Sequence, residues 1–430
     1  MKKIEKNIKK ALFALIVSFL FPLASFAQFD FNEINANDIN NIDFPKINIP
    51  APKAEPIVAE IADKSVIKAT VKDWTIMTFV NAKNNLEGFG LGDINEMEEV
   101  GSTSRINIIA EIGRMKGHSS SDGNWTGTRR LYIKKDNNTS KISSPIVKDL
   151  GKTNMGDWKE LVKFVTWAKK NYPAKHYALI VWNYGSGWLE GNPVKEISKG
   201  ISYDDETGNN IDTPQLAKAL SQMGKIDIYA SDACLMQMAS VVYEIGTSVD
   251  YIIGSEETEP GRGYTYDKFL GALKSKPTMS SFELSKKIIS AYVSFFSGNT
   301  QSVVNTKWTK YLPHFTNKFV DAVMKANIKT EVRTARDEAQ KYSIEDNKDM
   351  YDFVRRVVGS TSNRSVKGTG DMLMRFLEKY LIAYNDRGIM TTKSHGLAVY
   401  LPSGYYQGYT YDKLKWTTDS KWDEFIKWSK

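Results

Sequence analysis

Short apolar runs alternate with amphipathic stretches along the chain from about residue 73 onward. The runs are rich in β-branched and aromatic residues and only a few residues long, which is typical of strands buried on both faces of a sheet. They are WTIMTFV (74–80), RINIIAEI (105–112), YALIVW (177–182), KIDIYAS (225–231) and YIIGS (251–255).

Patterns with helical spacing lie between these runs, at 93–101, 157–172, 213–224 and 236–246. The last two end in glycine, which commonly terminates a helix. Strands that alternate with helices predict an α/β fold, in which a mostly parallel sheet is covered by helices on both faces.

The pattern changes after about residue 300. One more candidate strand, TQSVVNT, is followed by helical patterns and then by HGLAVYLP (395–402), which is typical of a strand. The helical patterns cover 307–327, 329–342 and 371–385. We therefore expect an α/β domain over residues 73–300 and a mainly helical region over 301–430 that completes the fold.

The first 72 residues differ from the rest. Residues 1–27 begin with lysines, continue with an apolar core and end in small residues, which is the pattern of a secretory signal peptide. We expect a secreted, periplasmic or cell-surface protein. A retained membrane anchor is the alternative, but Pro22 interrupts an already short apolar run, and no later stretch is suited to span a bilayer. Residues 28–72, rich in Asn, Asp, Ile and Pro, are predicted to be an extended segment or a pro-region, whose isoleucines suit docking.

The charge balance gives little sign of a polyanionic partner. Five lysines and one glutamate in residues 1–27 supply +4 of the net charge of +8, so about +4 remains for the mature chain. This excess is too small to indicate a nucleic-acid partner. We expect a monomer that contacts neither nucleic acid nor, after signal removal, a membrane interior.

Two strand ends carry the residues of chemical interest. Tyr184 follows the strand at 177–182, and Cys234, the single cysteine, follows the strand at 225–231. Because the carboxyl ends of parallel strands meet at one edge of a sheet, we expect both residues on neighbouring strands at that edge. Cys234 directly precedes a predicted helix, whose free N–H groups favour a thiolate. From position alone, a nucleophile and a packed, inert cysteine are both open.

Several blocks resemble the clostripain family of cysteine peptidases, and the resemblance runs from about residue 73 to the C-terminus. The blocks are MGDWKELVKFVTWAKKNYP, PAKHYALIVWNYGSGW, KGISYDDETG, KIDIYASDACLMQMASVVYE, SEETEPGRGYTYD and HGLAVYLPSG, of which the Asp-Ala-Cys-Leu-Met block is specific. The resemblance implies a caspase-like fold, a Cys–His dyad and cleavage after Arg or Lys. It implies that Cys234 is the nucleophile, that Asp232 lies at the base of the pocket for the basic side chain, and that the Gly185 N–H helps form the oxyanion hole.

The chain departs from the family where the dyad histidine belongs, because that position holds Tyr184. A thiol peptidase needs a group that takes and returns a proton near neutral pH. Histidine titrates near pH 6.5 and tyrosine near pH 10, so only about one phenol in a thousand is ionised at pH 7. General acid–base help is worth about 10²- to 10⁴-fold in rate. We therefore expect an inactive or strongly impaired peptidase.

Four histidines exist to replace the missing base. His176 and His395 are expected at the amino edge of the sheet, away from the cysteine, and His314 in a helix. His118 follows the second strand on the correct edge, in a Ser/Gly-rich loop, but a solvated loop residue is its simpler interpretation.

No cofactor is expected. The acidic stretch YDDETGNNID (203–212) is compatible with calcium but lacks the ligand spacing of an EF-hand, so a polar turn is the better interpretation. The loop between the strands that precede Tyr184 and Cys234 contains Lys195 and Lys199, where an active relative would cut its own chain, as the resemblance implies.

Three functions follow from these features. The first is a secreted pseudoenzyme that binds polypeptides with Arg or Lys, the second is an active endopeptidase that uses another base, and the third is a structural or adhesive surface protein. Tyr184 favours the first, whereas intact Cys234 and Asp232 favour the second.

Overall fold

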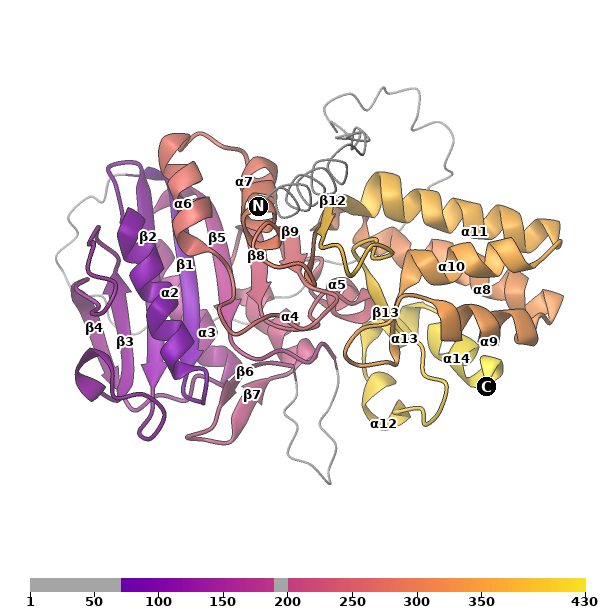
Figure 1. Ribbon diagram of the computed structural model, residues 1–430, viewed down its shortest axis with the longest axis horizontal. Helices are drawn as coiled ribbons and strands as arrows, with labels where there is room; N and C mark the ends of the chain where they lie inside the picture. The colour runs from indigo at the N-terminus through magenta and orange to yellow at the C-terminus, as the bar shows by residue number, and fades with distance from the viewer. Residues whose placement is uncertain (1–70, 189–199) are drawn as a thin grey trace, which may run out of the picture. The chain divides into compact units, whose positions relative to one another are not determined.

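The computed structural model describes residues 71–188 and 200–430, which form a nine-stranded sheet in the order β12-β10-β9-β8-β5-β1-β2-β3-β4 (Figure 1). Its strands are β1 (Lys72–Ala82), β2 (Ile106–Arg114), β3 (Gly127–Tyr132), β4 (Ile146–Gly151), β5 (Ala174–Trp182), β8 (Ile226–Asp232), β9 (Val249–Gly254), β10 (Thr300–Asn305) and β12 (Ile382–Arg387). Two small sheets pair β6 (Ile201–Asp204) with β7 (Asn209–Ile211), and β11 (Asn347–Asp349) with β13 (Ala398–Tyr400).

The five central strands are parallel, and the two flanks are antiparallel. β9, β8, β5, β1 and β2 run side by side in the same direction. β10 and β12 extend one flank, and β3 and β4 extend the other. Every residue of β2, and all but the first of β1, is buried, which explains their continuous apolar runs. The predicted mostly parallel sheet is confirmed.

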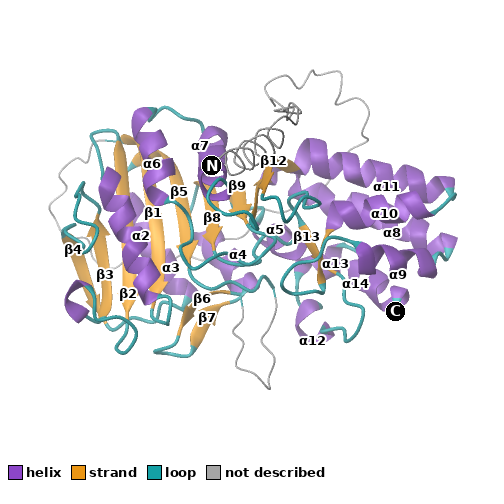
Figure 2. Cartoon of the chain, in the orientation of Figure 1, coloured by secondary structure: helices purple, strands orange, loops and turns teal. Residues whose placement is uncertain are grey.

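Helices cover both faces of this sheet (Figure 2). One core lies under α2 (Glu87–Val100), α6 (Tyr266–Ser275) and α7 (Ser281–Val293). On the other face α3 (Trp158–Asn171) packs on β1, where Phe79 lies 6.0 Å from Phe164 between ring centroids.

The remaining helices are short or belong to the C-terminal region. They are α4 (Thr213–Gln222), α5 (Ala239–Ile245), α8 (Leu312–Ala326), α9 (Lys329–Glu338), α10 (Met350–Ser360), α11 (Arg364–Phe376), α12 (Gly408–Tyr411), α13 (Lys415–Asp419) and α14 (Trp422–Ser429), with 3₁₀ turns at Asp122–Asn124 and Thr306–Tyr311. The C-terminal region is therefore mainly helical, as predicted. Of the helices in the described ranges, none has the length and apolar character needed to cross a membrane.

One of the two predictions for the last part of the chain is wrong and the other is confirmed. The helix expected over 371–385 ends in a π-helical turn at Leu377–Leu381, and the chain then becomes strand β12. β12 pairs with β10, whose backbone groups would otherwise form an open sheet edge. HGLAVYLP contains the predicted strand, β13, which pairs with β11 in a small separate sheet.

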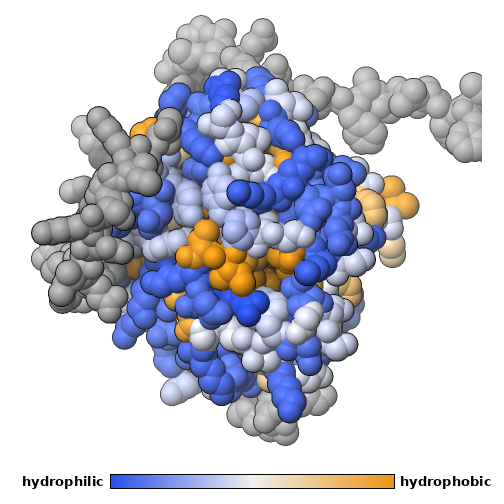
Figure 3. All heavy atoms as spheres, turned by 90° about the vertical axis from the view of Figure 1, so that its left-hand side faces the viewer, coloured by the Kyte–Doolittle hydropathy of each residue, from blue (hydrophilic) through white to orange (hydrophobic). Residues whose placement is uncertain are grey.

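The opposite edge of the sheet is β4, and Figure 3 shows that side of the molecule, where an apolar patch lies among hydrophilic residues. On β4 itself, Ile146 and Val147 are exposed. The predicted signal peptide and extended segment lie outside the described residues, apart from the last two residues of that segment, and so do Lys195 and Lys199.

Candidate functional site

The segments after β5 and β8 meet at the carboxyl edge of the sheet, as expected for Tyr184 and Cys234. The strands are parallel neighbours, and Trp182 of β5 is in register with Asp232 of β8. A β-carbon built on Gly185 would lie only 2.3 Å from the Cys234 carbonyl oxygen, so only glycine allows this approach. The predicted placement of both residues on one edge is confirmed.

The Tyr184 side chain is partly exposed and points toward the loop after β1. Its hydroxyl donates a hydrogen bond to Oδ1 of Asn85 at 2.9 Å. Its ring lies edge-on to Tyr203, with 6.3 Å between centroids. In the ranges that the structure describes, no hydrogen bond joins the phenol to the Cys234 sulfur.

The Cys234 thiol has acidic neighbours. Its Sγ accepts a hydrogen bond from the Glu259 N–H at 3.2 Å and faces the Glu259 carbonyl oxygen at 3.8 Å. Burial raises the pKa of the thiol to about 11, and the carboxylates of Glu259 and Glu257 act in the same direction. A thiolate is therefore disfavoured at neutral pH.

The helix expected over 236–246, directly after Cys234, begins only at Ala239. The intervening residues are held by the loop after β9, because Leu235 N–H donates to Glu257 O at 3.1 Å and Gln237 N–H to Ser255 O at 2.9 Å. Cys234 therefore does not lie at a helix N-terminus, and the predicted help for a thiolate is absent.

Asp232 is buried beneath this surface, with an exposed fraction of 3%. Its carboxyl group accepts hydrogen bonds from the Tyr264 N–H at 3.1 Å and the Tyr266 hydroxyl at 2.8 Å. It also shares a hydrogen bond with the Glu259 carboxyl group. Burial raises the pKa of Asp232 to about 7, despite the hydrogen bonds that favour its ionised form.

Asp93 of α2 and Glu259 complete a group of three carboxyl groups, which we call the acidic pocket together with Asp232. Burial, followed by the charge of Asp232, raises the pKa of Asp93 and of Glu259 well above the usual range. Trp182 donates a hydrogen bond to Asp93, and Gln301 Nε2 donates one to Glu259 Oε1 at 2.6 Å.

Two oxygen atoms of the acidic pocket accept no hydrogen bond from an N–H or hydroxyl group of the described residues. They are Oδ2 of Asp93 and Oε2 of Glu259, both buried. Between residues 71–188 and 200–430, no ion pair involves any of the three carboxyl groups. Buried carboxylates are normally paired, so this pocket is suited to a guanidinium or ammonium group brought by a ligand. Of these three carboxyl groups, the sequence alone predicted Asp232 as part of the site and did not assign Glu259 or Asp93 to it.

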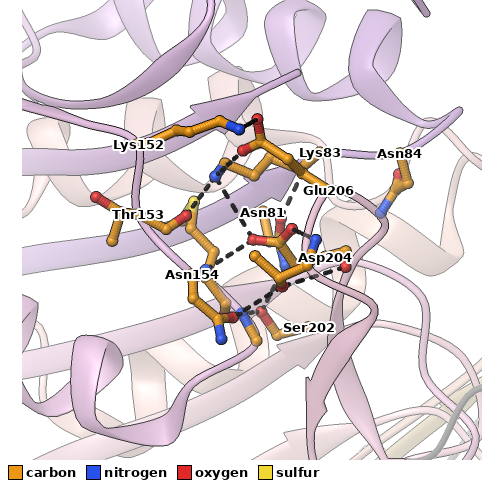
Figure 4. A network of polar contacts seen from close by, with 12 residues as sticks. Asn81, Lys83, Asn84, Lys152, Thr153, Asn154, Ser202, Asp204 and Glu206 are labelled. Atoms are coloured by element: carbon orange, nitrogen blue, oxygen red, sulfur yellow. Dashed lines mark hydrogen bonds and ion pairs between the residues drawn. The ribbon is translucent and has the colours of Figure 1, made fainter. Parts of the chain in front are cut away.

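A second polar network holds the segment before Tyr184 in place (Figure 4). Asn183 donates to the Asn81 carbonyl and accepts from the Tyr203 N–H at 2.8 Å. Asn81 in turn donates to Ser202 Oγ at 3.1 Å. Figure 4 shows Lys83 beside this group, directed toward Glu206.

Lys83 is fully buried in that network and fully engaged. Its Nζ lies 2.8 Å from Glu206 Oε2 and 3.6 Å from Asp204 Oδ2, and it also donates to the Thr153 carbonyl. Lys152 binds the other oxygen of Glu206 at 3.1 Å. An ammonium group held by two carboxylates is a poor general base, so Lys83 fixes structure and does not replace the missing histidine.

None of the four histidines forms a hydrogen bond with the Cys234 sulfur. His176 lies near the start of β5 and pairs with Asp227 at 3.0 Å, which confirms its expected place at the amino edge. His314 lies in α8, also as expected. His118 is exposed in the loop after β2, where it lies near the charge of Asp205.

The expected position of His395 is wrong. The next residue, Gly396, donates its N–H to Glu256 Oε2 at 3.1 Å, so His395 lies beside the loop after β9 at the carboxyl edge. This follows from the pairing of β13 outside the main sheet. The imidazole is engaged elsewhere, since Nδ1 contacts Asp349 at 3.1 Å and the ring stacks on Tyr351 at 4.3 Å.

The acidic stretch 203–212 forms the end of β6, a turn and β7. Its Asp204 carboxylate accepts from the Met155 N–H at 2.8 Å and faces Lys83. Among the described residues there is no group of three or more His, Cys, Asp or Glu side chains placed to hold a metal ion.

Comparisons with known proteins agree with this architecture. The model of the clostripain family, Peptidase C11, matches residues 78–428. Clostripain of Hathewaya histolytica is 33% identical over 226 residues, which are 47% of this chain and 42% of that protein. The match thus spans less than half the length of that relative.

Two solved structures share the fold over 82% of this chain. One is an inactive zymogen C11 protease from Parabacteroides distasonis, with a TM-score of 0.63, 20% identity and 99% of that chain covered. The other is a secreted C11 cysteine protease from Bacteroides thetaiotaomicron in complex with an irreversible peptide inhibitor, with a TM-score of 0.60, 19% identity and 100% covered. These two structures show the shared fold, and the match over residues 78–428 shows that this chain belongs to the clostripain family of C11 cysteine proteases.

Proposed function

We propose that this protein is a secreted, monomeric clostripain homologue that binds polypeptides through an Arg or Lys side chain and hydrolyses them poorly or not at all. The observation that carries the proposal is the acidic pocket, in which the carboxyl groups of buried Asp93 and Asp232 and of half-buried Glu259 form no ion pair within residues 71–188 and 200–430.

A basic side chain would satisfy what the pocket lacks. Its N–H groups would donate to the two unpartnered oxygens, and its charge would compensate the carboxylates as they lose their shared proton. A neutral guest of the same length would leave the carboxylates uncompensated. We therefore propose Arg or Lys as the recognised residue.

The thiol side of the site supports binding rather than turnover. With the pKa of Cys234 raised to about 11, roughly one thiol in ten thousand is ionised at pH 7. Tyr184 stands where an imidazolium would stabilise the thiolate and return the proton to the leaving amine. Both halves of the dyad chemistry are therefore weakened.

A slow endopeptidase is the second candidate, and one observation favours it. Gly185 packs directly on the Cys234 backbone, so the candidate oxyanion donor and the candidate nucleophile lie on adjoining segments. A nucleophile with an oxyanion donor requires two such groups side by side. What it lacks is the base.

Binding and turnover of matched peptides distinguish these candidates. One amidated peptide carries a single arginine, and its control carries glutamine at that position. We expect the arginine peptide to bind at least about tenfold more tightly and to remain intact. Equal binding of both peptides contradicts the pocket assignment. Cleavage after arginine that is lost in Cys234→Ala establishes the endopeptidase instead.

A further inference from the structure

Four large apolar side chains are exposed near the acidic pocket, and we call them the apolar rim. Their exposed fractions are 44% for Phe89, 55% for Phe295, 81% for Ile389 and 74% for Met390. Single exposed apolar residues are ordinary, but residues that join into one surface indicate an interaction site.

The two phenylalanines flank the same two residues. A β-carbon built on Gly261 would lie 2.8 Å from the Phe89 ring, and the Arg262 guanidinium lies 5.6 Å from the centroid of the Phe295 ring. Phe89 comes from α2 and Phe295 from the loop after α7. The segment 261–262 therefore joins them into one surface.

Ile389 and Met390 continue this surface from the loop after β12. Met390 donates its N–H to Ser297 O at 3.2 Å, two residues from Phe295. Both loops lie at the carboxyl edge of the sheet, because Thr300 at the start of β10 is in register with Arg387 at the end of β12. That is also the edge of the acidic pocket.

The backbone of residues 259–264 connects the apolar rim to the pocket. Glu259 belongs to the acidic pocket, and a β-carbon on Gly263 would lie 2.6 Å from Oδ1 of Asp232. Gly261 and Arg262, between them, contact the two phenylalanines. The segment 259–264 therefore contacts the acidic pocket through some of its residues and the apolar rim through others. Neighbouring residues of one extended peptide are long enough to reach both sites.

We propose that the apolar rim binds an apolar side chain close to the basic residue of a peptide ligand, so that the recognised sequence is a basic residue with an apolar neighbour. The inference rests on the proposed binding of Arg or Lys in the acidic pocket. Burying part of a leucine-sized side chain on the rim is expected to tighten binding by about tenfold. The positively charged Arg262 at the junction disfavours a second basic residue there.

A leucine scan tests the proposal. Amidated peptides carry one central arginine among glycines, and a single leucine is moved from one position to the next. Dissociation constants are measured by calorimetry with Cys234→Ala protein, so that no peptide is consumed. We expect leucine at one or two adjacent positions to tighten binding by about tenfold, and the gain to disappear in the double variant Phe295→Ser/Ile389→Ser.

The controls separate the rim from the pocket. Ile146→Ser, an exposed apolar residue on the far edge strand β4, should keep the gain. The all-glycine arginine peptide should bind the double variant and the parent protein equally. If leucine still tightens binding in Phe295→Ser/Ile389→Ser, or tightens binding at no position, the rim proposal is wrong and the acidic pocket assignment is unaffected. If the all-glycine peptide does not bind either protein, the acidic pocket assignment is wrong and the rim proposal fails with it.

Discussion

The acidic pocket and the Cys234 thiol are adjacent, yet the same carboxyl groups affect them in opposite ways. Glu259 contributes one of the three pocket carboxyls, and its backbone also holds the sulfur. Negative charge there favours a cationic ligand, whereas it disfavours a thiolate. Under the proposed function, the same negative charge therefore serves binding of a cationic ligand and weakens the thiol as a nucleophile.

The difference shows what the dyad histidine does in such a site beyond moving a proton. An imidazolium beside the sulfur would offset the acidic surroundings that recognition of Arg or Lys requires. If Tyr184 occupies that position, as we propose, the charges that serve specificity would remain and would oppose catalysis. Loss of one residue would then separate binding from chemistry.

A histidine at position 184 should have the largest effect, because it would restore a catalytic base beside Cys234. Tyr184→His should raise cleavage of arginine peptides by on the order of 10²-fold, the typical value of a positioned acid–base group. Full recovery of peptidase activity is not expected, because the Tyr184 hydroxyl is held by Asn85 and the smaller histidine side chain does not reproduce that contact. The gain must vanish in Tyr184→His/Cys234→Ala. A folded Tyr184→His protein without any gain shows that the site lacks more than the base.

The reactivity of Cys234 tests directly whether the surroundings of the thiol disfavour the thiolate. With its pKa raised to about 11, alkylation at pH 7 should be roughly 10²-fold slower than that of free cysteine, whose pKa is about 8.5. The rate of iodoacetamide modification, followed by mass spectrometry from pH 6 to 10, measures it. An apparent pKa of Cys234 below about 6 contradicts the influence of the neighbouring carboxyl groups and indicates a cationic partner for the sulfur. The exposed His118 is the first candidate for that partner and the first residue to substitute.

Replacing one carboxylate tests the binding role of the acidic pocket. Asp232→Asn should weaken binding of the arginine peptide by roughly tenfold, because charge-assisted hydrogen bonds exceed neutral ones by this order. Binding of the glutamine peptide should not change. Asp149→Asn, an exposed carboxylate of β4, is the matched control. Unchanged arginine binding in a folded Asp232→Asn protein places the recognition site elsewhere.

The sequence was sufficient to predict the parallel core and the edge where Tyr184 and Cys234 meet, because continuous apolar runs have few alternatives to buried strands. It failed where tertiary contacts override local pattern. β3 was missed because its Arg130 resembles a surface residue, although it is buried against Glu111 at 2.6 Å and Glu160 at 3.2 Å.

The acidic pocket was only partly predictable for the same reason. Asp93 lies in a helix with many acidic residues and resembles a solvated position, and only the packing of α2 on the sheet places it beside Asp232. The delayed start of α5 likewise depends on hydrogen bonds from Leu235 and Gln237 to a loop that follows a different strand. Neither contact leaves a periodic signal in the chain.

The smallest expected effect is on stability as the pH changes. Burial raises the pKa of both Asp232 and Glu96 to about 7, well above their unfolded values, so the folded state retains protons that the unfolded state releases between about pH 4 and 7. Stability from these groups is present at low pH and is lost as the pH rises through 7. We expect the unliganded protein to melt about 5 °C lower at pH 8 than at pH 5.5.

Asp232→Asn should reduce that difference in melting temperature, and an arginine peptide, which binds the ionised carboxylates, should reverse it. Thermal melts at the two pH values, with and without peptide, measure both effects, and a melting temperature that rises with pH in the absence of peptide contradicts an unpaired acidic pocket.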